Sequence, residues 1–221
     1  MQKQQIFRNL PKSLGLIRLA HRKTIVAMIE RNRPLPVEFY NRPTLEVARD
    51  LLGQSLVRRF EDGSRAEFPI HEVEAYDGFD DRASHASRGV TPRTSVMFGP
   101  PGFFYVYLCY GIHWLLNIVT GPEEYPAAIL IRGAGVYSGP ARLTKGLDID
   151  GGFNRKCATG GSDLWLEDRG VRLADSEIER TPRVGVHYAG PEWAGKPYRF
   201  LWKEMAELYL PNRRRKRDLA K

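Results

Sequence analysis

Two carboxylates and a phenol alternate along one predicted strand. Residues 68–76 have the composition of a β-strand, in which side chains alternate between the two faces. Glu72, Glu74 and Tyr76 therefore share a face. Neighbouring carboxylates destabilise a sheet unless they face water, a cation or a reacting group. Two interpretations follow: a plain solvated surface, or the wall of a cleft in which a carboxylate acts as general base.

More acidic residues follow this strand directly. Asp77, Asp80 and Asp81 bring the number of carboxylates between residues 72 and 81 to five. Oxygen ligands clustered in this way can bind Mg²⁺, so a metal-dependent nuclease is one hypothesis for the function.

The segment 77–102 is a predicted loop, rich in Asp, Ser, Gly and Pro. Loops of this length are usually functional or disordered. His85 follows the acidic strand closely, and Arg88 and Arg93 come after it. Arginines and free backbone amides hold phosphates without reading a base sequence. An isolated histidine is more often structural, but this position favours a functional role.

Two β-rich runs, residues 103–111 and 112–120, meet at a glycine and predict a hairpin with an aromatic tip. Tyr105 and Tyr107 share a strand face, which core packing explains. Tyr110 lies beside the turn, where a large aromatic side chain usually contacts a partner. Aromatic wedges in the minor groove open a DNA duplex, and phenols lining a pocket can stack on an extruded base.

The whole pattern predicts one α+β domain, with a curved, mainly antiparallel β-sheet core, flanking helices and a protruding β-hairpin. No internal repeat and no interdomain linker interrupts it. The other predicted elements are a helix over 44–52 that ends at Gly53, a hairpin of 55–60 with 68–76, a strand over 127–132, a helix over 140–147, and strand and loop over 165–173 and 183–202.

Composition excludes several classes of protein. The chain has 221 residues, of which 42% are hydrophobic and 27% charged. These values, and the lack of an apolar run of about 18 residues, exclude a wholly disordered chain and a transmembrane helix. Cys109 and Cys157 are too few for a disulfide framework, and no Cys/His cluster accompanies them to hold structural zinc. We therefore expect a reducing compartment.

Basic residues gather at the two ends of the chain. The 34 Lys and Arg exceed the 26 Asp and Glu by eight. Residues 1–34 carry a net +7 and residues 211–221 a net +5, which leaves −4 on residues 35–210. We expect a basic N-terminal extension, a functional domain and a basic C-terminal tail with these boundaries. The tails would add a salt-sensitive attraction to phosphates, whereas the domain needs individually placed cations.

Motifs across residues 36–202 resemble, in order, those of the alkyladenine (3-methyladenine) DNA glycosylase family. They are Glu72-Val73-Glu74-Ala75-Tyr76, Ser84-His85, Thr91-Pro92-Arg93, Met97-Phe98, Tyr105-Val106-Tyr107-Leu108-Cys109-Tyr110-Gly111 with Asn117, Ile129-Leu130-Ile131-Arg132, Ser138-Gly139-Pro140 and Arg183-Val184-Gly185-Val186.

The resemblance implies a monofunctional enzyme of base excision repair. It would flip 3-methyladenine, 7-methylguanine, hypoxanthine or ethenoadenine out of duplex DNA and hydrolyse the N-glycosidic bond, leaving an abasic site. Glu74 would be the general base that activates water against C1′, and Arg132 would help to hold the water and the carboxylate. Neither a metal nor a cofactor is implied. Cleavage passes through an oxocarbenium-like state, which a nearby carboxylate stabilises.

The same resemblance implies roles in binding the damaged nucleotide. The base would stack between Tyr76 and Tyr107 and be flanked by His85, and Asn117 would restrict the pocket against unmodified guanine. Tyr110 would fill the gap left in the duplex. The candidates for contact with the DNA backbone are Arg88, Thr91, Arg93 and Met97.

The chain departs from the family pattern at two places. Thr94 stands where the family usually has Asn, a change that we expect to be remote from the chemistry. Only five residues separate Arg132 from Ser138, where other members commonly have a longer helical segment. This second difference bears on the DNA footprint or the lesion range on that side.

Three functional classes therefore remain open: a DNA glycosylase, which is favoured, a metal-dependent nuclease, and a noncatalytic DNA-binding module in which the tails dominate. We expect double-stranded DNA with damaged purines as the partner, no membrane association, and a monomer. The expected location is the nucleoid region of the cytoplasm in a bacterium, or the nucleus in a eukaryote.

Overall fold

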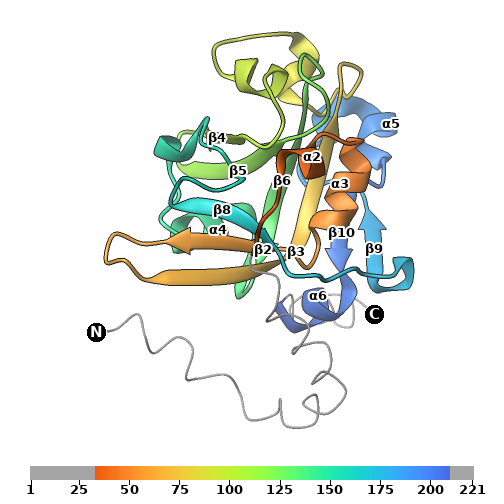
Figure 1. The fold of residues 1–221 in the computed structure, drawn as a ribbon. Coiled ribbons are helices and arrows are strands. Elements are labelled where there is room, and N and C mark those ends of the chain that lie inside the picture. Colours follow the sequence, from red (N-terminus) through yellow and green to blue (C-terminus); the bar gives the residue numbers. More distant parts are fainter. Residues whose placement is uncertain (1–32, 210–221) are drawn as a thin grey trace.

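The computed structural model describes residues 33–209 (Figure 1). The predictions for residues 1–32 and 210–221, and with them almost all of both basic tails, lie outside the described residues. Arg33 and Pro34, which we assigned to the N-terminal extension, form strand β1 (Arg33–Pro34) and pair with β8 (Leu164–Asp168) of the domain. No helix within residues 33–209 is long and apolar enough to cross a membrane.

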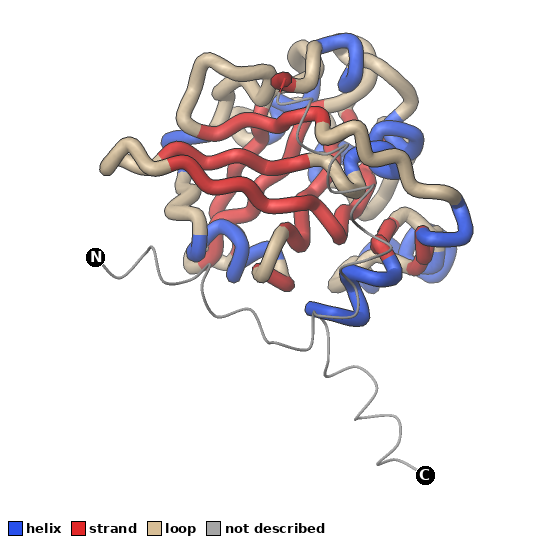
Figure 2. Tube along the Cα trace, turned by 60° about the horizontal axis from the view of Figure 1, so that its bottom comes forward, coloured by secondary structure: helices blue, strands red, loops and turns tan. Residues whose placement is uncertain are grey.

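A curved, ten-stranded sheet forms the centre of the domain, with helices around it (Figures 1 and 2). The main strand order is β1-β8-β2-β3-β6-β5-β4, with β10 on β3, β9 on β10 and β7 on β6. Neighbouring strands are antiparallel, and the predicted α+β class is confirmed. The bounds are β2 (Ser55–Arg59), β3 (Arg65–Asp77), β4 (Phe104–Cys109), β5 (His113–Val119), β6 (Ala127–Ala134), β7 (Tyr137–Ser138), β9 (Ile178–Thr181) and β10 (Arg199–Trp202).

The predicted first long helix is α3 (Thr44–Leu51), whose buried residues include Val47, Ala48 and Leu51. They pack into the main hydrophobic core against the sheet. Gly53 follows the helix with φ +85, a left-handed conformation that favours glycine at this position. The other helices are α2 (Val37–Tyr40), α4 (Pro140–Gly146), α5 (Gly190–Gly195) and α6 (Lys203–Tyr209).

Strand β3 is the longest strand, and its ladder with β6 contains a bulge. Glu72 lies opposite Gly133, but the next residue, Val73, lies opposite Ile131. Arg132 is therefore left without a partner across the ladder. A bulge of this kind changes the direction of a side chain, and here it allows the guanidinium of Arg132 to contact the carboxylates of β3.

The β4–β5 hairpin has the predicted aromatic tip. Tyr110 and Gly111 have φ of 51 and 72, and the N–H of Ile112 donates to the carbonyl of Cys109. Two consecutive positive φ angles are typical of a type I′ hairpin turn. The Tyr110 side chain is 92% exposed.

Two segments distant in sequence close over the end of β3 at Asp77. Of the predicted loop over residues 77–102, Asp77 still belongs to β3, and the rest contains the 3₁₀ helices η3 (His85–Arg88) and η4 (Thr94–Phe98). Residues 182–198 contain η7 (His187–Ala189) and α5. Residues from both segments line the pocket described next.

Candidate active site

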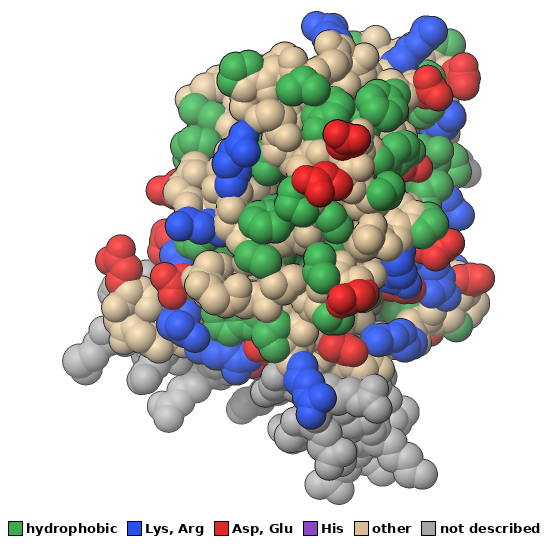
Figure 3. Space-filling model, turned by 45° about the horizontal axis from the view of Figure 1, so that its top comes forward, with side chains coloured by type: hydrophobic (Ala, Val, Ile, Leu, Met, Phe, Trp, Pro, Cys, Tyr) green, Lys and Arg blue, Asp and Glu red, His purple; other side chains and the backbone are tan. Residues whose placement is uncertain are grey.

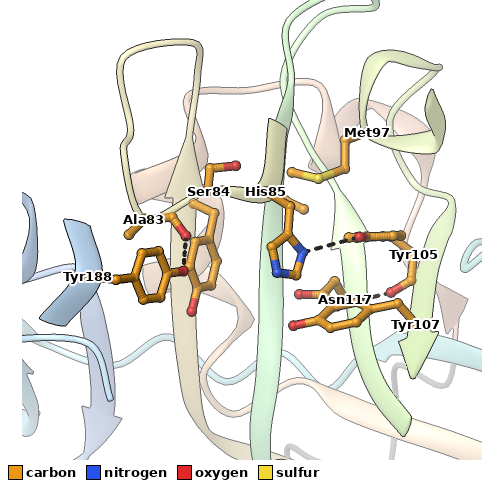
Figure 4. A pocket seen from close by; sticks show the side chains of 10 residues that line it. Ala83, Ser84, His85, Met97, Tyr105, Tyr107, Asn117 and Tyr188 are labelled. Atoms are coloured by element: carbon orange, nitrogen blue, oxygen red, sulfur yellow. Dashed lines mark hydrogen bonds between the residues drawn. The ribbon is translucent and has the colours of Figure 1, made fainter. Parts of the chain in front are cut away.

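A pocket of about 490 Å³ lies between the sheet, the β4–β5 hairpin and these two segments. A smaller inner cavity of about 50 Å³ adjoins it (Figure 4). Both cavities are lined by Tyr76, Ser84, His85, Tyr107 and Tyr188. The outer pocket also reaches Glu74 and Arg132, and Asn117 lines the inner cavity, so the predicted catalytic and base-binding residues line two adjoining cavities.

Glu74 lies in the wall of the outer pocket, and its side chain is fully buried. One carboxylate oxygen, Oε1, accepts the backbone N–H of Val184 at 2.7 Å, and Oε2 accepts the hydroxyl of Tyr76 at 3.1 Å. Burial raises the pKa of Glu74 above the usual value, although Arg132 and these two hydrogen bonds oppose the shift. The result is a carboxylate with increased affinity for a proton, as a general base requires.

Glu72 occupies a different environment. Its Oε1 accepts hydrogen bonds from Nε of Arg132 at 2.8 Å and from Nε of Arg199 at 2.7 Å, and Nη2 of Arg199 lies 2.6 Å from the same oxygen. Burial alone would raise the pKa of Glu72, but the two guanidinium groups hold it below the usual value. Arg132 also lies 3.4 Å from Oε1 of Glu74, so one guanidinium links the two carboxylates. Because both carboxylates are buried, the interpretation of this face as solvated surface is wrong.

Half of the ten residues that line the inner cavity are aromatic, four tyrosines and His85. The rings of Tyr105 and Tyr107 stack at 5.1 Å, and His85 meets Tyr107 edge to face at 4.7 Å. Asn117 lines the same cavity, and its amide donates to the carbonyl of Tyr105 (Figure 4). Burial, aided by Arg93 and Arg88, lowers the pKa of His85 to about 4. His85 is therefore neutral at physiological pH.

Of the two tyrosines that we assigned to core packing, only Tyr105 is buried. Tyr107 is partly buried and lines both cavities. The explanation by core packing alone is therefore wrong for Tyr107.

The five carboxylates between residues 72 and 81 do not converge on a common site. Asp81 pairs with Arg183, Asp77 accepts the hydroxyl of Tyr125, and Asp80 is exposed. Among residues 33–209 no group of three or more His, Cys, Asp or Glu side chains could hold a metal ion. The nuclease hypothesis therefore has no metal site in the described part of the chain.

The predicted DNA-contacting residues lie around the mouth of the pocket. Arg88, Arg93 and Tyr110 line the outer pocket, and Arg88 and Arg93 are exposed. Thr91 is also exposed, and its backbone N–H donates to Oγ1 of Thr94. Thr94, the departure from the family pattern, also donates to the carbonyl of Gly89 and so ties this loop together.

Met97 is the exception among these candidates. Its side chain is buried and lines the inner cavity. The structure therefore does not place the Met97 side chain at the DNA-facing surface, because the fold uses it for packing. Only its backbone remains as a candidate for phosphate contact.

The short connection after Arg132 is a tight turn between β6 and β7. Gly135 has φ +54 and lies close to Phe68, where a β-carbon would meet the phenyl ring at 2.9 Å. The N–H of Gly139 then donates to the carbonyl of Arg132. The turn therefore leads through β7 into α4, and residues 133–137 contain no helix.

The contribution of residues 183–188 to the pocket was not predicted from the sequence. Val184 supplies the amide that binds Glu74, and Tyr188 lines both cavities and donates its hydroxyl to the carbonyl of Ala83. The motif Arg183–Val186 was visible in the sequence, but nothing in it indicated which residue would reach the carboxylate. The Arg183–Asp81 ion pair joins residues 102 positions apart, so no local spacing could reveal it.

Comparison with known proteins identifies the family to which the chain is similar. A model of the family described as methylpurine-DNA glycosylase matches residues 38–138 and 134–206. A protein of Anaeromyxobacter dehalogenans (strain 2CP-C) named "Putative 3-methyladenine DNA glycosylase" is 46% identical over 187 residues, which cover 80% of this chain and 87% of that protein. Proteins with the same name from Methanocella arvoryzae and Myxococcus xanthus are 43% and 45% identical, cover 76% of this chain in each case, and are themselves covered to 92% and 89%.

Proposed function

The chain belongs to the methylpurine-DNA glycosylase family and is thus a DNA glycosylase, and from this premise we propose that it removes alkylated and deaminated purines from duplex DNA. The substrates would be 3-methyladenine, 7-methylguanine, hypoxanthine and ethenoadenine, and the product an abasic site. The observation that supports this most strongly is a buried carboxylate, Glu74, in the wall of an aromatic pocket beside an exposed aromatic hairpin tip.

In the proposed reaction Glu74 takes a proton from water while the water oxygen bonds to C1′ of the flipped nucleotide. The bond between C1′ and the purine nitrogen breaks, and its electron pair leaves with the base. Arg132, held by Glu72, would orient the water and the carboxylate. The raised pKa of Glu74 suits this role, because it increases the proton affinity of the base. The proposed reaction uses neither a metal nor a cofactor.

The pocket would hold the extruded purine between Tyr76 and Tyr107, with His85 at its edge. Aromatic stacking gives affinity for any purine, and a purine that is already cationic is a good leaving group, so one pocket would serve several lesions. Asn117 would restrict the entry of guanine, because the exocyclic amine of guanine would clash with this side chain. Because the pKa of His85 is lowered to about 4, this side chain adds no positive charge beside a cationic base.

The DNA would lie across the mouth of the pocket. Tyr110 would enter the duplex and occupy the position of the flipped nucleotide, and Arg88, Thr91 and Arg93 would contact the backbone. Their exposed positions around the outer pocket support this arrangement. We also propose that the protein acts as a monomer, in the nucleoid region of a bacterial cytoplasm or in a eukaryotic nucleus.

The decisive assay measures free bases released from duplexes that carry each of the four lesions, in EDTA. The proposal predicts released purine and an intact strand that breaks only after alkali. A metal-dependent nuclease would be inactive in EDTA and would break the strand directly in a parallel reaction with Mg²⁺, whereas a noncatalytic binding module would release no base in either reaction. Either of these outcomes would contradict the proposed function.

A further inference from the structure

A buried ion pair lies directly behind the proposed stacking wall. Asp81 and Arg183 have fully buried side chains and form two hydrogen bonds, of 2.5 Å from Nη1 and 2.8 Å from Nη2. Arg183 also donates to the carbonyls of Ala75 and Trp193. These contacts leave neither charged group free to move into solvent.

The guanidinium of Arg183 lies over the ring of Tyr76, with Cζ 4.8 Å from the ring centroid. Tyr76 lines both cavities, but Arg183 lines neither. The aromatic ring therefore separates the guanidinium from the space that a base would occupy. Asp81 contacts the guanidinium and is not a lining residue of either cavity.

This arrangement directs the positive end of a buried dipole at the stacking wall. A cation on one face of an aromatic ring attracts its π electrons and weakens the attraction of the opposite face for a second cation. Charges in a buried site interact more strongly than in water. A neutral base is little affected by either charge, whereas a cationic base is repelled by Arg183 and attracted by Asp81.

We propose that the Arg183–Asp81 pair sets the preference of the pocket between cationic and neutral damaged purines. The inference rests on the proposed function and extends it to substrate charge. Arg183 is a positioning residue whose cation, behind Tyr76, opposes the binding of cationic bases, and Asp81 limits that effect. A pair that only stabilises the fold would instead affect all lesions alike.

The test compares two variants on two lesions under single-turnover conditions with subsaturating enzyme. One duplex carries 3-methyladenine, which is cationic while attached to the sugar, and the other carries hypoxanthine, which is neutral. Asp81→Asn leaves the Arg183 cation unbalanced, so the rate ratio of 3-methyladenine to hypoxanthine should fall roughly three- to tenfold. Arg183→Gln removes the cation, so the same ratio should rise, by about threefold.

The matched control is Glu167→Gln, which removes the carboxylate of a buried ion pair outside the pocket. Glu167 lies 3.4 Å from Arg169, and the two side chains are 5% and 8% exposed. We expect a lower melting temperature for this variant and an unchanged rate ratio. Thermal unfolding of every variant separates loss of folded protein from altered selectivity.

Opposite shifts of the ratio in Asp81→Asn and Arg183→Gln would support the inference. If the rate ratio of 3-methyladenine to hypoxanthine is unchanged in both variants, or shifts in the same direction in both, the inference about the Arg183–Asp81 pair is wrong. The proposed function would still hold in that case, provided that the wild-type protein releases the bases. If Asp81→Asn does not fold, Arg183→Lys is used in its place. Because this variant keeps the positive charge, its rate ratio should equal that of the wild type, whereas the ratio of Arg183→Gln should rise. Failure of the wild-type protein to release either base would overturn both the inference and the proposed function.

Discussion

Glu72 and Glu74 are two residues apart on the same strand, yet their environments shift their pKa values in opposite directions. Two guanidinium groups keep the pKa of Glu72 low, whereas burial dominates at Glu74 and raises its pKa. Two acids whose pKa values are shifted apart can take different roles. Glu72 stays ionised and holds Arg132, whereas Glu74 can exchange a proton. The alternation along β3 predicted that the two would share a face, but not which of them the arginines would contact.

Tyr76→Phe should move the acidic limb of the rate profile to higher pH. Glu74 must be deprotonated to accept a proton, so activity is lost as the pH falls through its raised pKa. The hydroxyl of Tyr76 donates to the carboxylate, which lowers the pKa of Glu74, so removal of the hydroxyl should raise that pKa further. Single-turnover rates between pH 4 and 9 measure this limb. If the acidic limb stays at the wild-type pH or moves to lower pH, the hydrogen bond from Tyr76 does not lower the pKa of Glu74.

Glu72→Gln should reduce stability strongly and activity only moderately. The substitution removes the buried carboxylate that pairs with Arg132 and Arg199. Breaking a buried ion pair lowers the free energy of unfolding by about 3–5 kcal/mol. Base release should fall only about tenfold, the equivalent of one charged hydrogen bond that positions Arg132. Thermal unfolding and single-turnover rates on the same preparation test both parts. Loss of activity as complete as for Glu74→Gln would mean that Glu72 takes part in the chemistry.

At the scale of elements, the segments with a clear pattern could be predicted and those defined by tertiary contacts could not. The apolar stripe of α3 and the two hairpins are encoded in residues close together in sequence. Helix α2 has four residues and α5 six, too few for a periodic pattern, so packing onto the sheet determines them. The bulge at Arg132 depends on how β6 pairs with β3, which the sequence of neither strand reveals.

The tip of the β4–β5 hairpin presents the exposed ring of Tyr110. Tyr110→Ala should weaken binding to a duplex with a paired lesion and slow its cleavage, because the wedge offsets part of the cost of unstacking, a few kcal/mol. Tyr110→Phe should retain most function, since the ring fills the gap. A mispaired lesion is already partly unstacked, so its cleavage should be affected less. Equilibrium binding and single-turnover rates on paired and mispaired hypoxanthine duplexes measure these effects.

The matched control for this prediction is Ile112→Ala, at the same tip. Ile112 is 71% exposed, so its loss removes apolar surface from the hairpin without removing an aromatic ring. Its effect should be clearly smaller than that of Tyr110→Ala. Equal effects of the two variants, or wild-type behaviour of Tyr110→Ala on paired duplex, would contradict the wedge assignment.

At the scale of the whole molecule, the surface charge of the domain is mixed. Figure 3 shows Lys and Arg side chains interspersed with Asp and Glu and with apolar side chains on the face that it presents. This agrees with the net charge of −4 on residues 35–210. The excess of positive charge in the sequence therefore lies in residues 1–34 and 211–221, and we expect the domain to contact DNA phosphates through individual arginines near the pocket.

Deletion of residues 1–32 and 211–221 should weaken nonspecific DNA binding and flatten its dependence on salt. Each lost phosphate contact reduces the slope of log affinity against log salt by about one. Arg33 and Pro34 are kept, because β1 pairs with β8. Single-turnover cleavage at saturating enzyme should not change. An unchanged salt slope after truncation would show that the domain makes the phosphate contacts by itself.

Glu74→Gln tests most directly whether Glu74 activates water in an aromatic pocket for flipped purines. The amide keeps the shape of the carboxylate but cannot accept the proton. Release of hypoxanthine in EDTA at saturating enzyme should fall by more than about a hundredfold, within the usual range of 100- to 10,000-fold for a general base, while affinity for the same duplex stays close to wild type. Base release by Glu74→Gln at more than about a hundredth of the wild-type rate would contradict the claim.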